Sequence, residues 1–258
     1  MNTFDVLHPG PWFGPKVELV NSLKERSTEN VEANFLEICS RLKSGDFSAR
    51  SSLKTFILSC TDIGIKRQAI RLYCYVARHE DVIFLGNLLG RCDHDEVFSV
   101  VTYAPHTLSP QIVPYLFALL EEYEGTSIAE AILSSIDKIF PFQYDGGDVN
   151  ISELGQRFAG FARDLDMGKY YYGGVEAFAG HLTKNLIETA AITRQQETPF
   201  PLADVPTLLS IWSGEKCPVF YGEPVADAEF ENVINFSKHI ASMQFVFGKK
   251  YFYGCQVR

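Results

Sequence analysis

The side chains best suited to chemistry in this sequence are His94 and His106, because Cys92, Asp93 and Asp95 lie near them. These residue types bind zinc, but a structural zinc site needs four ligands in a closed tetrahedron. One Cys-x-His pair and a single distant histidine do not match a standard zinc spacing. We therefore expect no metal, and we expect Asp93 or Asp95 to cap the next helix.

Carboxylates and glycines provide no clearer sign of catalysis. The turn containing Asp145 and Asp148 has the composition of a calcium loop, but it lacks the alternating ligands and final glutamate of an EF-hand. Adjacent acids such as Glu121 and Glu122 suit general acid and base chemistry, yet neighbouring exposed helix positions explain them equally well. The patterns GxSxG, GxxxxGK[ST] and HExxH are absent. We expect no catalytic residue and no cofactor, and hence no enzyme.

Three consecutive tyrosines, followed by Gly173 and Gly174, are more suggestive of binding. Side chains alternate in a strand and rotate around a helix, so three in a row cannot all point inward. Tyrosine offers a large contact area and is frequent at binding hot spots. We expect at least one of Tyr170, Tyr171 and Tyr172 to be exposed, with the others packed against a neighbouring helix.

Charge is distributed unevenly along the chain, whose formal net charge is -9. Residues 41–78 contain eight Lys or Arg against two acids, whereas residues 79–168 contain four against fifteen. Such an acidic block repels phosphate backbones and attracts basic proteins. The alternative interpretation is a solvated acidic face that only keeps the protein soluble. The residues expected to contact a partner are Asp93, Asp95, Glu96, Glu121, Glu122, Glu124, Asp145, Asp148, Tyr170, Tyr171 and Tyr172.

The elements that would position these residues repeat at a fixed spacing. Val82, Leu85, Leu88 and Leu89 recur 31 residues later as Val113, Leu116, Leu119 and Leu120, and Val97, Val100 and Val101 recur as Ile128, Ala131 and Ile132. A period of this length, filled by two amphipathic helices, indicates an α-solenoid. The predicted fold is all-α, with stacked helix pairs followed by a less regular, aromatic-rich C-terminal helical part.

Three segments follow from this pattern. Residues 1–27, with Trp12 and Phe13, are expected to cap the repeats; residues 28–168 form them, and residues 169–258 form a helical extension packed on them. Predicted C-terminal helices span residues 175–194 and 230–247, and the aromatic tail is β-prone. The six cysteines are scattered as in a reduced cytosolic protein, and no export signal or membrane span is recognisable.

The segment from Ser109 to Gly125, followed by a helix starting at Ser127, resembles HEAT repeats over roughly residues 31–165. In general build, a short acidic chain with such repeats also resembles immunity proteins of bacterial toxin systems. That resemblance implies a cytoplasmic protein that binds and neutralises a cognate toxin, often a nuclease, through an acidic surface. Two alternatives are a HEAT scaffold and, since the build is also similar, a HEAT-like DNA glycosylase. The acidic block argues against the glycosylase, because its negative charge repels nucleic acid.

Overall fold

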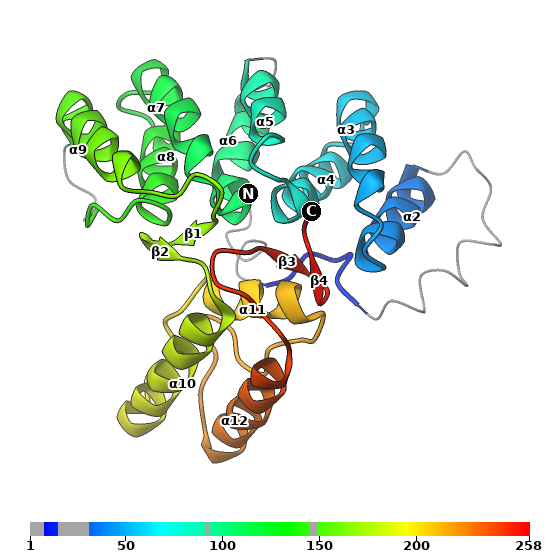
Figure 1. The fold of residues 1–258 in the computed structure, drawn as a ribbon, viewed down its shortest axis with the longest axis vertical. Helices are drawn as coiled ribbons and strands as arrows, with labels where there is room; N and C mark the ends of the chain where they lie inside the picture. Colours follow the sequence, from blue (N-terminus) through cyan, green and yellow to red (C-terminus); the bar gives the residue numbers. More distant parts are fainter. Residues whose placement is uncertain (1–7, 15–30, 91–92, 145–148) are drawn as a thin grey trace. The chain divides into compact units, whose positions relative to one another are not determined.

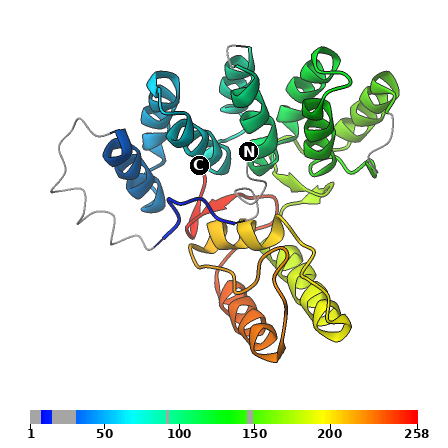
Figure 2. The same ribbon diagram turned by 180° about the vertical axis from the view of Figure 1, so that it is seen from behind.

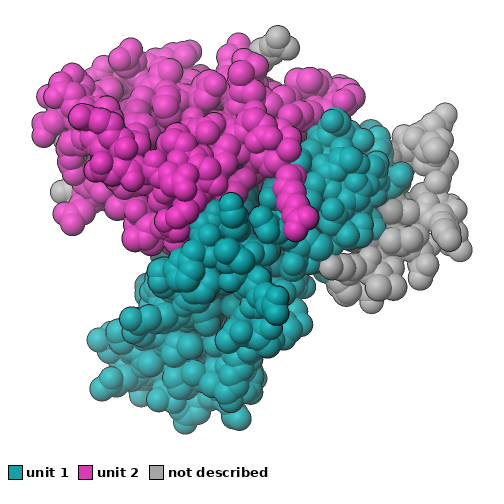
Figure 3. Space-filling view, in the orientation of Figure 1, with its two compact units in different colours: residues 1–53, 178–257 teal, residues 54–177, 258 magenta. Residues whose placement is uncertain are grey.

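The computed structural model describes residues 8–14, 31–90, 93–144 and 149–258. By its internal contacts the chain forms two compact units (Figure 3), one of residues 1–53 with 178–257 and the other of residues 54–177 with residue 258. The expected boundary near residue 168 stays a prediction. None of the described helices is long and apolar enough to cross a membrane.

The unit of residues 54–177 is mainly helical, in agreement with the predicted all-α class. Its α-helices are α3 (Arg50–Ser59), within which the division falls, α4 (Ile63–Val76), α5 (Val82–Leu89), α6 (His94–Tyr103), α7 (Val113–Glu122), α8 (Ser127–Asp137) and α9 (Ile151–Arg163). Short 3-10 turns, Ala104–Thr107 and Pro110–Ile112, join α6 to α7. Helix α6 packs against both α4 and α8 (Figures 1 and 2).

The 31-residue repeat marks the buried faces of these helices. Val82 and Leu85 of α5 are buried, as are their counterparts Val113 and Leu116 of α7. The start of α6 also agrees with the capping residue expected from the sequence. Asp93 caps α6, accepting a hydrogen bond from the Glu96 amide at 2.9 Å, as predicted.

A β-hairpin of β1 (Tyr171–Tyr172) and β2 (Val175–Glu176) follows α9. Gly173 and Gly174 form its two-residue turn with φ values of 57° and 78°, which glycine adopts without steric penalty. Their amides donate to the carbonyls of Lys138 and Ile139 at 2.8 and 3.1 Å, satisfying acceptors just beyond the end of α8. The prediction of a helix from Val175 was therefore wrong at its start.

The unit of residues 1–53 and 178–257 combines the two ends of the chain. It contains α2 (Val31–Lys43), a 3-10 turn (Phe47–Ala49), α10 (Ala179–Gln196), α11 (Val205–Ser213), α12 (Asp227–Ser242), and a second hairpin of β3 (Tyr251–Phe252) and β4 (Cys255–Gln256). Helix α10 packs along α12 and against α11. The β-prone tail predicted at the C-terminus is thus a hairpin.

The two hairpins share one local arrangement. In each, three helices precede the hairpin, and the first helix contacts the other two: α7 with α8 and α9, and α10 with α11 and α12. The turn amides of Tyr253 and Gly254 donate to Ile211 and Trp212 of α11 at 2.8 and 2.7 Å, as Gly173 and Gly174 do after α8. The sequence Gly-Lys-x-Tyr starts at residue 168 and again at residue 248. The two hairpins and their contacts with the preceding helices therefore recur at an offset of 80 residues.

The described part of the N-terminal segment is held by its aromatic side chains and by Lys43. The Trp12 side chain is 2 % exposed, and its ring lies 5.9 Å from that of Phe252. Lys43 Nζ, buried at the end of α2, donates to the backbone carbonyls of Trp12 and Gly14. Within this unit, the segment therefore joins α2 to the C-terminal hairpin.

Burial lowers the pKa of Lys43 to about 8, whereas the unfolded chain keeps an ordinary pKa near 10.5. Between these values the unfolded state binds more protons, so the free energy of unfolding should rise with pH. The carbonyls around Nζ solvate the charge, so we expect a gain of at most about 1 kcal/mol between pH 8 and 9. Denaturant titrations should show it in the wild type but not in Lys43→Met. Equal pH profiles for both would disprove it.

Candidate functional site

The acids nearest the start of α6 are largely neutralised within their own unit. Asp95, whose side chain is 72 % exposed, pairs with Arg67 of α4 at 3.2 Å, and Glu96 pairs with Lys66 of the same helix. Asp93 is engaged as the helix cap. These three residues were predicted to face a partner, but the structure gives each an intramolecular role.

Ion pairs also join α3 to the start of α5. Asp81 is buried and accepts from Lys54 Nζ at 2.7 Å, and its second oxygen lies 3.4 Å from Arg78 Nε. Arg78 also reaches Glu80 at 3.0 Å. Half of the cations in the basic block are thus paired with the first acids of the acidic block. Among the described residues, the unpaired acids of the acidic block lie further along the chain.

These acids include a group we term the acidic corner: Glu121 and Glu122 in the last turn of α7, Glu124 in the following turn, and Glu130 in α8. All four are exposed, and none of them enters an ion pair within the described parts of the chain. Negative charge at a helix C-terminus opposes the helix dipole. Helix stability therefore does not explain Glu121 and Glu122. The predicted Asp145 and Asp148 lie outside the described residues.

Two surface hollows flank this acidic corner. One, of about 680 Å³, is lined by Glu121 and Glu124 together with Phe117 of α7 and the start of α9. The other, of about 560 Å³, is lined by Glu124 and Glu130 and by Tyr144. Glu124 therefore borders both hollows. Sequence analysis missed Glu130, which was recognisable as an acid one turn into the next predicted helix.

The tyrosine run mainly anchors the first hairpin. Tyr170 and Tyr171 are 5 % and 4 % exposed. The Tyr170 ring stacks on His79 with centroids 4.2 Å apart, and the Tyr171 hydroxyl accepts from the Asp166 amide at 3.0 Å. Tyr172 is partly exposed and pairs with the exposed Val175 across the hairpin. Only Tyr172 of the three has surface to offer a partner in this conformation.

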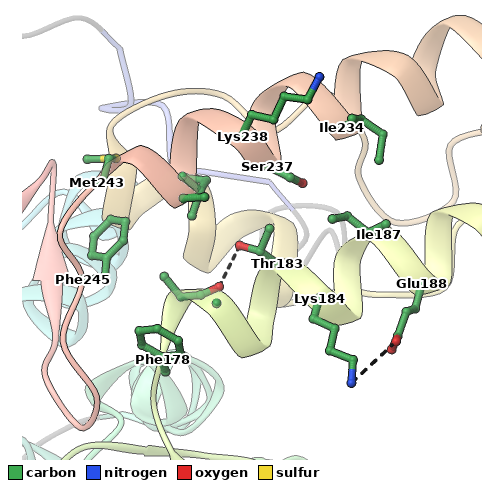
Figure 4. Close-up of a pocket in the computed structure, with 14 residues that line it drawn as sticks. Phe178, Thr183, Lys184, Ile187, Glu188, Ile234, Ser237, Lys238, Met243 and Phe245 are labelled. Carbon is green, nitrogen blue, oxygen red and sulfur yellow. Dashed lines mark hydrogen bonds and ion pairs between the residues drawn. The ribbon is translucent and has the colours of Figure 1, made fainter.

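A third hollow, which sequence analysis did not predict, lies between α10 and α12 (Figure 4). It has a volume of about 640 Å³, and its lining is mostly apolar, including Phe178, Ile187, Ile234 and Phe245. We term it the α10–α12 groove. The sequence signal that would have revealed it is an isoleucine close to a lysine on each of these two helices. A helix buried in a core rarely carries lysines beside its apolar residues.

The described residues show no arrangement typical of a metal centre: no group of three or more His, Cys, Asp or Glu among them is placed to hold an ion. His106 is buried and stacks on Tyr75 with centroids 4.6 Å apart, whereas the side chain of His94 lies outside the description. The five described cysteines are free thiols, and burial raises the pKa of Cys39 and of Cys217 to about 12. Both thiols are therefore protonated at neutral pH and unsuited to nucleophilic chemistry.

Comparison with known proteins identifies the family. No curated protein and no solved structure matches the chain. The family model described as immunity protein 47 matches residues 11–257. Because this match covers both compact units and nearly the whole chain, the chain belongs to the immunity protein 47 family and is an immunity protein.

Proposed function

We propose that this protein neutralises a nuclease toxin by covering the toxin's basic substrate surface with the acidic corner. In this proposal, HEAT-like stacking of the helices in residues 54–177 provides the rigid frame. The observation that carries it is the position of Glu121 and Glu122. They are exposed, without a described ion-pair partner, at a helix end where their charge is unfavourable for folding.

Electrostatic steering explains why such a surface suits an inhibitor. Complementary charge raises the association rate from about 10⁵–10⁶ to as much as about 10⁸–10⁹ M⁻¹s⁻¹ at low salt. Fast capture matters when the partner is a toxin, because unbound toxin is active. The α4 cations do not offer an equivalent surface to nucleic acid, since Lys66 and Arg67 are already paired with Glu96 and Asp95.

The test uses the toxin domain encoded beside the immunity gene. We expect Glu121→Lys combined with Glu124→Lys to lower the association rate constant about 10- to 100-fold at low salt, with a smaller loss at high salt. The dissociation rate should change less. Stopped-flow mixing at several ionic strengths measures the association rate.

A matched control carries the same change in net charge at two exposed acids that do not belong to the acidic corner. Glu37 is exposed on α2, and Asp164 is exposed at the far end of α9, about 20 Å along that helix from its start. Glu37→Lys combined with Asp164→Lys should change the association rate much less. Equal slowing by both double variants would mean that net charge, rather than the acidic corner, steers the toxin.

A further inference from the structure

The α10–α12 groove is not occupied by any described segment of its own unit. Its walls run from Gly180 to Glu188 on α10 and from Ile234 to Ala241 on α12. With a rise of 1.5 Å per residue, this is about 10–12 Å along each helix, or two helical turns. Figure 4 shows Ile187 and Ile234 on the facing walls.

The polar groups within the groove are already engaged by their own helices. Thr183 Oγ1 donates to the carbonyl of Ala179, and Ser237 Oγ donates to the carbonyl of Val233, each at 2.7 Å. The groove therefore has no hydroxyl proton left for a polar ligand. An apolar occupant gains more binding free energy than a polar one, since it removes the isoleucine and phenylalanine surfaces from water.

Charge at the rim restricts the occupant further. On the α10 side Lys184 lies 3.8 Å from Glu188, so the two charges largely balance. On the α12 side Lys238 is exposed and belongs to no ion pair found among the residues that the structure describes. A segment lying in the groove therefore meets uncompensated positive charge along its α12 flank.

The two hollows differ in charge. The hollow between α7 and α9 is lined by Glu121 and Glu124, whereas the α10–α12 groove has an apolar floor with Lys184, Glu188 and Lys238 at its rim. A basic surface suits the first hollow and an apolar one suits the second. A partner that contacts both would therefore need two different features.

We propose that the α10–α12 groove binds a short amphipathic helix of the toxin. The apolar side chains of this helix, at positions i, i+3 or i+4 and i+7, face Ile187 and Ile234. A carboxylate on the flank of the helix lies beside Lys238. Helices recognise such grooves through apolar anchors at this spacing. The inference rests on the proposed function, because the toxin supplies the helix. It adds an anchor that governs dissociation to the acidic corner, which governs association.

The experiment measures toxin dissociation by surface plasmon resonance, using the toxin domain encoded beside the immunity gene. Ile187→Asp and Ile234→Asp should each speed dissociation about 30-fold or more, the effect of a hot-spot residue. Ile192→Asp is the control, since Ile192 is exposed on the same helix beyond the groove lining. It should change dissociation less than about 3-fold.

A second variant keeps the test valid if an aspartate disturbs folding. Lys238 is exposed, so Lys238→Glu should leave the melting temperature unchanged while speeding dissociation about 10-fold. Carbodiimide treatment of the wild-type complex should join Lys238 to a toxin carboxylate within an amphipathic helix.

The possible failures are distinguishable. If Lys238→Glu and the isoleucine variants dissociate at the wild-type rate while the acidic-corner variant still associates slowly, the groove proposal is overturned and the proposed function stands. A wild-type dimer in light scattering that Ile234→Asp separates would make the groove a self-contact, which also overturns it. If the wild type does not bind the toxin, both proposals fail.

Discussion

Replacing Gly174 by alanine should lower the free energy of unfolding by about 2–5 kcal/mol. Gly174 has a φ of 78°, a left-handed conformation that costs an L-residue about 1–2 kcal/mol. A Cβ atom there would also lie 2.7 Å from Pro141 Cδ and 2.8 Å from Cγ. Relieving this overlap adds about 1–3 kcal/mol of strain. Urea denaturation of the full chain measures the loss.

Gly173 provides a matched control in the same turn. Its φ is 57°, but a Cβ atom there would meet nothing within 4 Å. Gly173→Ala should therefore lose only the conformational part, about 1 kcal/mol. The second hairpin supports this order, because Tyr253 occupies the first position of its turn and Gly254 the second. Similar losses for Gly173→Ala and Gly174→Ala would show that the contact with Pro141 is not restrictive.

The helices of residues 54–177 were predictable because burial imposes periodicity. Leu85 and Leu116 repeat at 31 residues since both must face the same kind of interior. Caps were predictable for a similar reason: Asp93 is a short side chain that satisfies an orphan amide. These are local rules, and they do not depend on which segments meet in three dimensions.

The candidate site was less predictable because ion pairing depends on which helices are neighbours. The sequence places Lys66 and Glu96 30 residues apart, and only the packing of α4 on α6 brings them together. Adding charges along the chain could not foresee that the acids near α6 are paired with α4. The partner contacts predicted for Glu121, Glu122 and Glu124 stay a prediction, and these three acids form no ion pair among the residues that the structure describes.

The first hairpin escaped prediction, and the second was indicated only by its β-prone residues, because the strands of both contain only two residues each. Alternation cannot be recognised over so short a length, and Tyr170 to Tyr172 resembled an exposed aromatic run. The usable signal was the second Gly-Lys-x-Tyr at residue 248, at an offset of 80 rather than 31. Once this recurrence is recognised, the β-prone tail predicts a hairpin at the first Gly-Lys-x-Tyr as well.

Trp12→Ala should lower the free energy of unfolding by about 3–5 kcal/mol, the usual range for a buried tryptophan. The side chain is 2 % exposed against Phe252, so its removal leaves a cavity beside the second hairpin. The backbone carbonyl that accepts from Lys43 is retained, so the loss reports the ring alone.

Phe13 is the control because it is partly exposed, with its ring 5.6 Å from that of Tyr253. Phe13→Ala should lose less than half as much, and Trp12→Phe should recover part of the loss. If Trp12→Ala cost less than about 1 kcal/mol, the N-terminal segment would not be an integral part of this unit's core.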